Sequence, residues 1–209
     1  MKSTWYYIKA CIATIRRRLF IKEFCHIGKG SGFGPKGYGD TCVIWDKKKI
    51  SVGENSWFGR ESTIRVLSSY NYTDGVQPLS GKLTIGNNVH CTEKCLIVCA
   101  GNMIIEDNVL IGPEVFIIDN NHGMNPNTGG YSNQPIIVKD VHIEEGVWLG
   151  QRVCILPGVT VGAHSIVGAN SVVTHDVPPY SIAVGSPARV VKRWCHDKQE
   201  WIPVKKNDN

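Results

Sequence analysis

A six-residue period runs through most of this chain and limits the folds that it can adopt. From Ile143 the sequence divides into hexads that each begin with an aliphatic residue, such as Leu149, Ile155 and Val161. The same register reappears upstream, with hexads that start at Val52, Phe58, Ile64, Ile85, Cys91, Ile97, Ile105, Ile111, Ile117 and Ile137. Helix faces repeat about every 3.6 residues and strand faces about every two, so the period fits neither a helix nor a hairpin meander.

Six residues are enough for a short strand and one corner of a solenoid. The aliphatic residue points inward, a small residue packs beside it, and glycine permits the tight turn. Three such faces make a triangular coil of about 18 residues, and successive coils stack as parallel strands. Glycine follows the first hexad residue at positions 53, 59, 86, 112, 150, 162 and 168. The sequence therefore predicts an all-β fold, a parallel β-helix.

The register also predicts the organisation of the chain. We expect a helical and basic segment over 1–24, a β-helix domain over 25–188, and a tail over 189–209. Polar segments interrupt the register, and we expect loops at 67–81 and 119–134. Polar loops held by a rigid scaffold are common places for catalytic and binding groups.

The net charge of +5 is concentrated at the N-terminus. Residues 1–22 contain six basic and no acidic residues, which leaves 17 basic and 18 acidic residues elsewhere. A near-neutral body lacks the positive surface of a nucleic-acid-binding protein, so we expect no nucleic-acid partner. Apolar residues recur at helical spacing over 4–20. They fit either a cap on the open end of the solenoid or a basic amphipathic anchor for an anionic membrane.

The eight cysteines are best interpreted as reduced thiols, because we find neither a secretory signal nor an apolar run that could span a bilayer. We therefore expect a cytoplasmic protein, and a peripheral one at the inner membrane if the N-terminal segment is an anchor. Cys91 and Cys95 fall on inward positions of the hexads. We interpret them as small buried hydrophobic residues and expect no metal site.

Several stretches carry a family resemblance. They are Val147-Trp-Leu-Gly, Val153-Cys-Ile-Leu-Pro-Gly, Val167-Gly-Ala-Asn-Ser-Val and Ala183-Val-Gly-Ser-Pro-Ala-Arg-Val-Val. Together they resemble the C-terminal signature of hexapeptide-repeat acyltransferases, and more narrowly that of galactoside, maltose and polysaccharide O-acetyltransferases. The resemblance covers roughly half the chain, from about Ile85 to Trp194.

This resemblance implies a left-handed β-helix, a homotrimer with active sites between adjacent subunits, and acetyl-CoA as co-substrate. It implies that His122, in the loop after Val109-Leu-Ile-Gly-Pro-Glu, is the general base. The implied CoA-binding residues are Trp148, Gln151, Ala169, Thr174, His175, Arg189 and Lys192. Arg193 adds a further cation for the CoA phosphates.

The chemistry agrees with this assignment. A sugar hydroxyl must lose its proton as it attacks a thioester, and a neutral imidazole can accept that proton near neutral pH. No Ser or Cys in the pattern points to a covalent intermediate, so we expect direct transfer. Asp119 and Glu114 are alternative partners that could orient His122, and the sequence does not decide between them.

The acceptor is less well defined. Galactoside-type members place an acceptor-binding Asn on the coil before the catalytic loop, whereas here Thr92 stands nearest that position. We take Thr92, Asn121 and Asp119 as acceptor-binding candidates and a sugar hydroxyl of a bacterial surface polysaccharide, or its precursor, as the acceptor. The alternatives are a xenobiotic (antibiotic) acetyltransferase, an N-acetyltransferase acting on an amino sugar, a zinc-dependent γ-type carbonic anhydrase and a noncatalytic scaffold.

Overall fold

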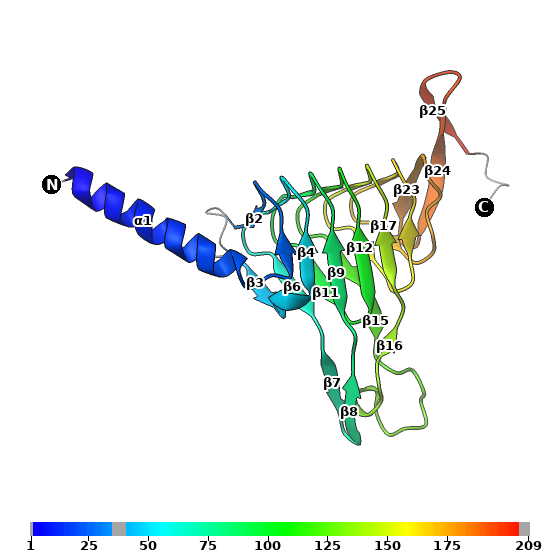
Figure 1. Ribbon diagram of the computed structural model, residues 1–209. Helices are drawn as coiled ribbons and strands as arrows, with labels where there is room; N and C mark the ends of the chain where they lie inside the picture. Colours follow the sequence, from blue (N-terminus) through cyan, green and yellow to red (C-terminus); the bar gives the residue numbers. More distant parts are fainter. Residues whose placement is uncertain (1, 35–40, 205–209) are drawn as a thin grey trace.

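A computed structural model describes residues 2–34 and 41–204, and the side chains from residue 11 onward within these ranges. Three parallel sheets form the faces of a triangular solenoid, and six coils can be followed through the described residues (Figure 1). The fold is the predicted left-handed parallel β-helix. The described part of the chain contains no helix that is long and apolar enough to cross a membrane.

Each face is a ladder of short strands. The first face consists of β1 (His26–Ile27), β4 (Ile50–Val52), β9 (Lys82–Ile85), β12 (Asn102–Ile105), β17 (Val141–Ile143) and β20 (Thr160–Val161). The second consists of β2 (Gly32–Phe33), β5 (Trp57–Phe58), β10 (His90–Cys91), β13 (Leu110–Ile111), β18 (Trp148–Leu149), β21 (Ile166–Val167) and β23 (Ser181–Gly185). The third consists of β3 (Val43–Trp45), β6 (Thr63–Val66), β11 (Leu96–Cys99), β14 (Phe116–Ile118), β19 (Cys154–Ile155) and β22 (Val172–Val173).

The first residue of each hexad lies in the core. On the third face Ile64, Ile97, Ile117 and Ile155 occupy successive rungs, and all four side chains are buried. Each buried aliphatic side chain of this size contributes about 1.5–3 kcal/mol of transfer free energy. Ile137 is an exception to the predicted register: it is 39% exposed and pairs with Asn121 outside the solenoid. Because the polar insertion is longer than expected, the chain rejoins the core only at Val141.

The glycines have a different role from the one predicted. The left-handed corner conformation falls on the fourth hexad residue, as at Arg152, His164 and Asn170. The glycine after the first residue instead allows close approach between coils. A Cβ atom on Gly59 would lie 1.4 Å from the backbone oxygen of Thr92. Glycine is therefore required at such positions because two coils touch there, and not because the turn needs a special backbone angle.

Different elements lie at the two ends of the solenoid. Helix α1 (Lys2–Ile21) projects away from the first coil (Figure 1). The chain just beyond it returns to the core, where Phe24 stacks on Phe33 with ring centroids 5.3 Å apart. At the other end β24 (Ala188–Cys195) pairs antiparallel with β23, and β25 (Glu200–Pro203) pairs with β24. The segment predicted as a tail from 189 thus continues the second sheet as far as Pro203; residues 205–209 lie outside the described residues.

Candidate active site

Two polar protrusions leave the same edge of the third face. The first follows β6 and contains the hairpin of β7 (Ser69–Tyr72) and β8 (Gly75–Pro78). The second follows β14 and contains β15 (Asn120–Asn121), η2 (Tyr131–Asn133) and β16 (Ile137–Val138). Because β6 and β14 flank β11 in the sheet, the protrusions lie side by side below the solenoid (Figure 1).

His122 lies at the base of the second protrusion and its side chain is exposed. Its Nδ1 atom is 3.1 Å from the Tyr70 hydroxyl of the first protrusion. The two rings meet edge to face, with centroids 5.8 Å apart. Within the described residues no hydrogen bond engages Nε2 of His122, so this nitrogen is available to a substrate.

Tyr70 was missed in the sequence, which offered Asp119 or Glu114 as the partner of His122. Glu114 instead forms an ion pair with Arg152, with Oε2 2.8 Å from Nε, and this lowers the pKa of the carboxyl group. Tyr70 stands 52 residues before His122. The only feature of the sequence that could have indicated Tyr70 was its position in a polar segment that interrupts the six-residue register.

Asp119 is not placed to bind an acceptor, contrary to the prediction. Its side chain is fully buried, and its carboxylate accepts hydrogen bonds from the backbone N–H groups of Ala100 and Gly101 and from the Asn120 amide. These bonds hold the tight corner after β11 against the start of the insertion. A buried charge must be satisfied by hydrogen-bond donors. These bonds within the protein therefore engage the Asp119 carboxylate and leave it unavailable to a substrate. Asn121, in contrast, is exposed on β15 beside His122.

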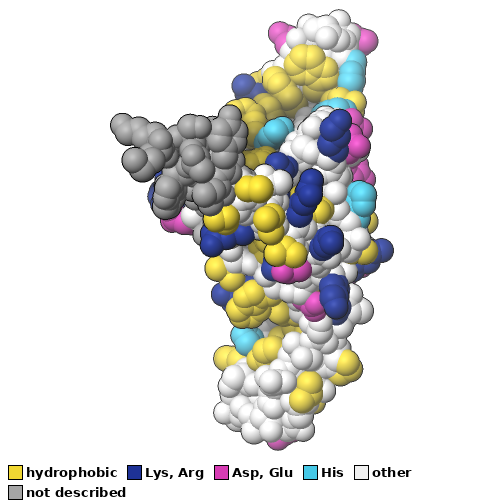
Figure 2. All heavy atoms as spheres, turned by 60° about the vertical axis from the view of Figure 1, so that its left-hand side comes forward, with side chains coloured by type: hydrophobic (Ala, Val, Ile, Leu, Met, Phe, Trp, Pro, Cys, Tyr) yellow, Lys and Arg dark blue, Asp and Glu magenta, His cyan; other side chains and the backbone are white. Residues whose placement is uncertain are grey.

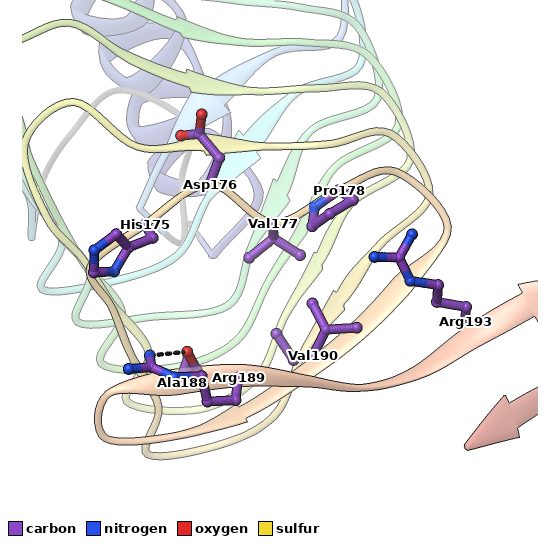
Figure 3. A pocket seen from close by; sticks show the side chains of 9 residues that line it. His175, Asp176, Val177, Pro178, Ala188, Arg189, Val190 and Arg193 are labelled. Atoms are coloured by element: carbon purple, nitrogen blue, oxygen red, sulfur yellow. Dashed lines mark hydrogen bonds between the residues drawn. The ribbon is translucent and has the colours of Figure 1, made fainter. Parts of the chain in front are cut away.

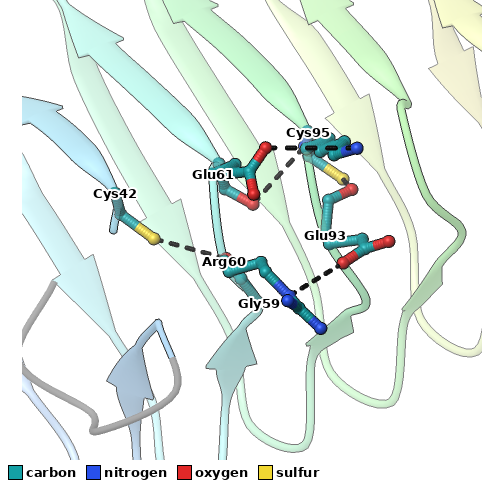
Figure 4. A network of polar contacts seen from close by, with 8 residues as sticks. Cys42, Gly59, Arg60, Glu61, Glu93 and Cys95 are labelled. Atoms are coloured by element: carbon teal, nitrogen blue, oxygen red, sulfur yellow. Dashed lines mark hydrogen bonds and ion pairs between the residues drawn. The ribbon is translucent and has the colours of Figure 1, made fainter. Parts of the chain in front are cut away.

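Thr92 lies at a different corner from His122. It follows β10, at the corner between the second and third faces, whereas His122 lies beyond the opposite edge of the third face. The neighbouring corner residues form ion pairs between coils, with 3.2 Å between Arg60 Nε and Glu93 Oε2 (Figure 4). Thr92 and His122 are therefore not brought together within one chain.

The residues predicted to bind CoA fall into two groups. Trp148 on β18, and Gln151 and Ala169 at the corner between the second and third faces, form an exposed group on neighbouring coils. Thr174 and His175 lie at the opposite edge of the third face, where Thr174 Oγ1 is 2.8 Å from His175 Nδ1. Because the third face separates the two groups, one chain does not enclose a CoA molecule with both.

A cavity of about 330 Å³ lies beside the second group (Figure 3). His175, Arg189 and Arg193 contribute its basic lining, and Asp176 contributes the acidic side chain. The Arg189 guanidinium donates a hydrogen bond to the backbone oxygen of Ala188, which leaves further N–H donors for an anion. Lys192 is exposed on β24 but does not line this cavity.

Cys91 and Cys95 are buried, as predicted from their inward hexad positions. Among residues 2–34 and 41–204, no group of three or more His, Cys, Asp and Glu side chains is arranged to hold a metal ion.

Known proteins are similar to this chain in sequence and in fold. Residues 140–175 match the family described as "Bacterial transferase hexapeptide (six repeats)". The chain is 33% identical to the Escherichia coli K12 protein named "Putative lipopolysaccharide biosynthesis O-acetyl transferase WbbJ", over 77% of this chain and 80% of WbbJ. It is 32% identical to the galactoside O-acetyltransferase of the same organism, over 68% of this chain and 63% of that enzyme. The solved structure of a hexapeptide-repeat acetyltransferase from Vibrio cholerae with acetyl coenzyme A is 28% identical, with a TM-score of 0.55 over 86% of this chain and 76% of that one.

These similarities show that the chain belongs to the hexapeptide-repeat acetyltransferase family and is an acyltransferase. They confirm the family predicted from the hexads and from the C-terminal motif. The matched segments cover from 54% to 80% of the lengths of the first curated relatives. The donor, the acceptor and the assembly of this protein therefore do not follow from the names of its relatives.

Proposed function

We propose that this protein transfers an acetyl group from acetyl-CoA to a sugar hydroxyl of a bacterial surface polysaccharide or its precursor. The observation that carries the proposal is the exposed His122, held by Tyr70 where two polar protrusions meet. The V. cholerae structure contains acetyl coenzyme A, and the names of WbbJ and the galactoside enzyme both specify O-acetyl transfer, which supports this donor and this reaction.

His122 acts as the general base in this proposal. In the tautomer in which Nδ1–H donates to the Tyr70 oxygen, Nε2 carries the lone pair that accepts the proton of the acceptor hydroxyl. The hydroxyl oxygen attacks the thioester carbonyl, the carbon–sulfur bond then breaks, and the imidazolium returns the proton to the thiolate of CoA. General-base catalysis of this kind contributes about 10²–10⁴-fold in rate.

The basic cavity supports the donor. Arg189, Arg193 and His175 line it, and CoA carries phosphate groups that such side chains bind. We place Thr174 and Lys192 beside this end of the donor. Trp148, Gln151 and Ala169 lie on the other side of the third face, so we propose that they bind the donor held by a neighbouring copy.

A homotrimer is supported by the outer surfaces of the coils. The outward column of the second face is apolar except for His90, with Leu110 44% and Trp148 48% exposed. Its apolar members are Trp57, Leu110, Trp148, Ile166 and Ile182. The outward column of the third face contains Leu96, Phe116, Cys154 and Val172. The first face instead presents mainly polar side chains, among them Ser51, Thr84, His142 and Thr160. Two apolar faces are the surfaces that further copies would cover.

The test is thiol release from acetyl-CoA with a panel of sugars and oligosaccharides. The wild-type protein is compared with His122→Ala and with His26→Ala, a control in which an exposed histidine of the first face is removed. We expect acceptor-dependent release that falls at least about 100-fold in His122→Ala and is unchanged in the control. Full acceptor-dependent release by His122→Ala would refute the assigned base.

Helix α1 supports a separate proposal about location. Residues 1–22 carry six basic and no acidic residues, and the exposed side chains of Ile12, Ile15 and Leu19 recur at helical spacing. An apolar stripe flanked by cations suits an anionic membrane surface, so we propose a cytoplasmic enzyme that contacts the inner membrane through this helix. The protein should sediment with phosphatidylglycerol vesicles, and Ile15→Asp should weaken this binding. Equal sedimentation of both proteins would contradict the contact.

A further inference from the structure

The two protrusions form one structural unit. The amide of Gln77 on β8 makes two hydrogen bonds with the backbone of Ile136, accepting from its N–H at 2.8 Å and donating to its oxygen at 3.1 Å. Thr73 donates a hydrogen bond to Asn133, and Tyr70 contacts His122. The hairpin is thus fastened to the insertion along its length, and the two form a single surface.

A cavity of about 630 Å³ lies between the protrusions. Tyr72 and Asp74 line it from the hairpin, and Gly123, the residue after His122, lines it from the insertion. Such a volume is within the range of small-molecule sites. Tyr70 and Tyr72 are two residues apart on the same strand, so both side chains lie on the same face of the hairpin. The cavity therefore adjoins the histidine that Tyr70 holds.

The lining of this cavity has the composition of a carbohydrate site. Its apolar parts are Tyr72, Met124, Pro135 and Ile137, and its polar parts are Asp74, Asn125, Thr128, Asn133 and Gln134. Amide and hydroxyl groups can donate to and accept from sugar hydroxyls, while an aromatic ring packs on the apolar face of a sugar. The buried Gln134 amide is already hydrogen-bonded to the backbone of Asn125 and Gly130. Tyr72 and the side-chain amides of Asn125 and Asn133 are therefore the groups suited to a pyranose ring.

The charge of the two protrusions indicates whether the cavity can bind a neutral or an anionic sugar. Segments 67–81 and 119–134 contain no Lys or Arg, and Asp119 is buried and occupied, so Asp74 is their one exposed acid. Figure 2 shows the contrast, with Lys and Arg side chains on the body and mainly uncharged side chains on the protruding lower end. An anionic sugar would meet a carboxylate there without a compensating cation, which is unfavourable.

We infer that this cavity binds the sugar ring that receives the acetyl group, that this ring is uncharged, and that Asp74 accepts hydrogen bonds from its hydroxyls. The inference rests on the proposed function, because it places the acceptor beside His122. It assigns to the hairpin a specificity role that is separate from catalysis.

The test uses saturation-transfer NMR with methyl glucoside and methyl galactoside and with the corresponding methyl uronides, in the presence of CoA. We expect the wild-type protein to bind a neutral glycoside and not its uronide. Asp74→Asn should weaken binding of the neutral glycoside about tenfold and reduce the discrimination against the uronide. Asp197→Asn, which changes an exposed acid between β24 and β25, is the matched control and should behave as wild type.

The outcomes separate the two claims. If Asp74→Asn binds glycosides as wild type does, or if wild type prefers the uronide or binds neither class, the cavity is not the site inferred here. Thiol release that depends on both an acceptor and His122 would leave the proposed function standing in each of those cases. If the wild-type protein neither binds CoA nor releases thiol with any acceptor, the proposed function itself is wrong.

Discussion

At the scale of single residues, His122 has a neutral partner, whereas the sequence suggested a carboxylate. A tyrosine oxygen fixes the ring and selects the tautomer, but it adds no negative charge to stabilise the imidazolium. The partner therefore acts through geometry. The carboxylate of Asp119 instead accepts hydrogen bonds from the backbone N–H groups of Ala100 and Gly101.

Removal of the Tyr70 hydroxyl should test this positioning role. Tyr70→Phe keeps the edge-to-face ring contact and loses one neutral hydrogen bond, which is worth about 1 kcal/mol. We expect kcat to fall about five- to tenfold while KM for acetyl-CoA and the thermal midpoint stay unchanged. A drop in the thermal midpoint that parallels the loss of kcat would show that the tyrosine is merely structural.

Burial controls the chemistry of the core cysteines. Desolvation, and to a smaller extent the charge of Asp119, raises the pKa of the Cys99 thiol to about 12. The folded protein should therefore keep Cys99 as an unreactive thiol at pH 8, whereas exposed Cys11 and Cys25 react with maleimide. Peptide mapping after brief labelling checks this pattern, and prompt labelling of Cys99 in the folded state would contradict it.

At the scale of elements, the hexads predicted the core ladders because the first residue of each hexad points inward. A strand shifted by one residue would place polar side chains in the core instead. The hexads did not predict why glycine is needed. That reason depends on contact between coils, as between Gly59 and Thr92, which stand 33 positions apart in the chain. The Tyr70–His122 contact and the position of Ile137 could not be predicted either. Both lie in irregular segments, which have no sequence period and are positioned by tertiary contacts.

Two glycine substitutions distinguish close approach from turn geometry. Gly59→Ala would place Cβ against a backbone oxygen of the next coil and should lower the free energy of unfolding by about 1–3 kcal/mol. Gly75→Ala, in the hairpin, would meet only the Tyr72 side chain, at 3.6 Å from its hydroxyl, and should be neutral. Chemical denaturation measures both. Equal stability of the two variants would show that the coils can move apart at little cost.

At the scale of the whole molecule, the distribution of apolar side chains predicts the assembly. The outward positions of the second and third faces are mainly apolar, although His90, Thr63 and Arg65 interrupt them, so Leu110→Asp should prevent association between copies. Light scattering should give three times the 23.1 kDa chain mass for wild type and a smaller mass for the variant. Thr84→Asp, on the polar first face, should leave the mass unchanged. A wild-type monomer would rule out the proposed sharing of donor-binding residues.

The most direct test of His122-dependent O-acetyl transfer follows the acetyl group itself. Carbon-13-labelled acetyl-CoA is incubated with a neutral oligosaccharide and either wild type or His122→Ala, and the product is examined by NMR before and after mild alkali. We predict an alkali-labile ester on a sugar hydroxyl, formed by wild type at least about 100 times faster than by the variant. An alkali-stable amide, or equal labelling by both proteins, would contradict the proposed reaction or the proposed base.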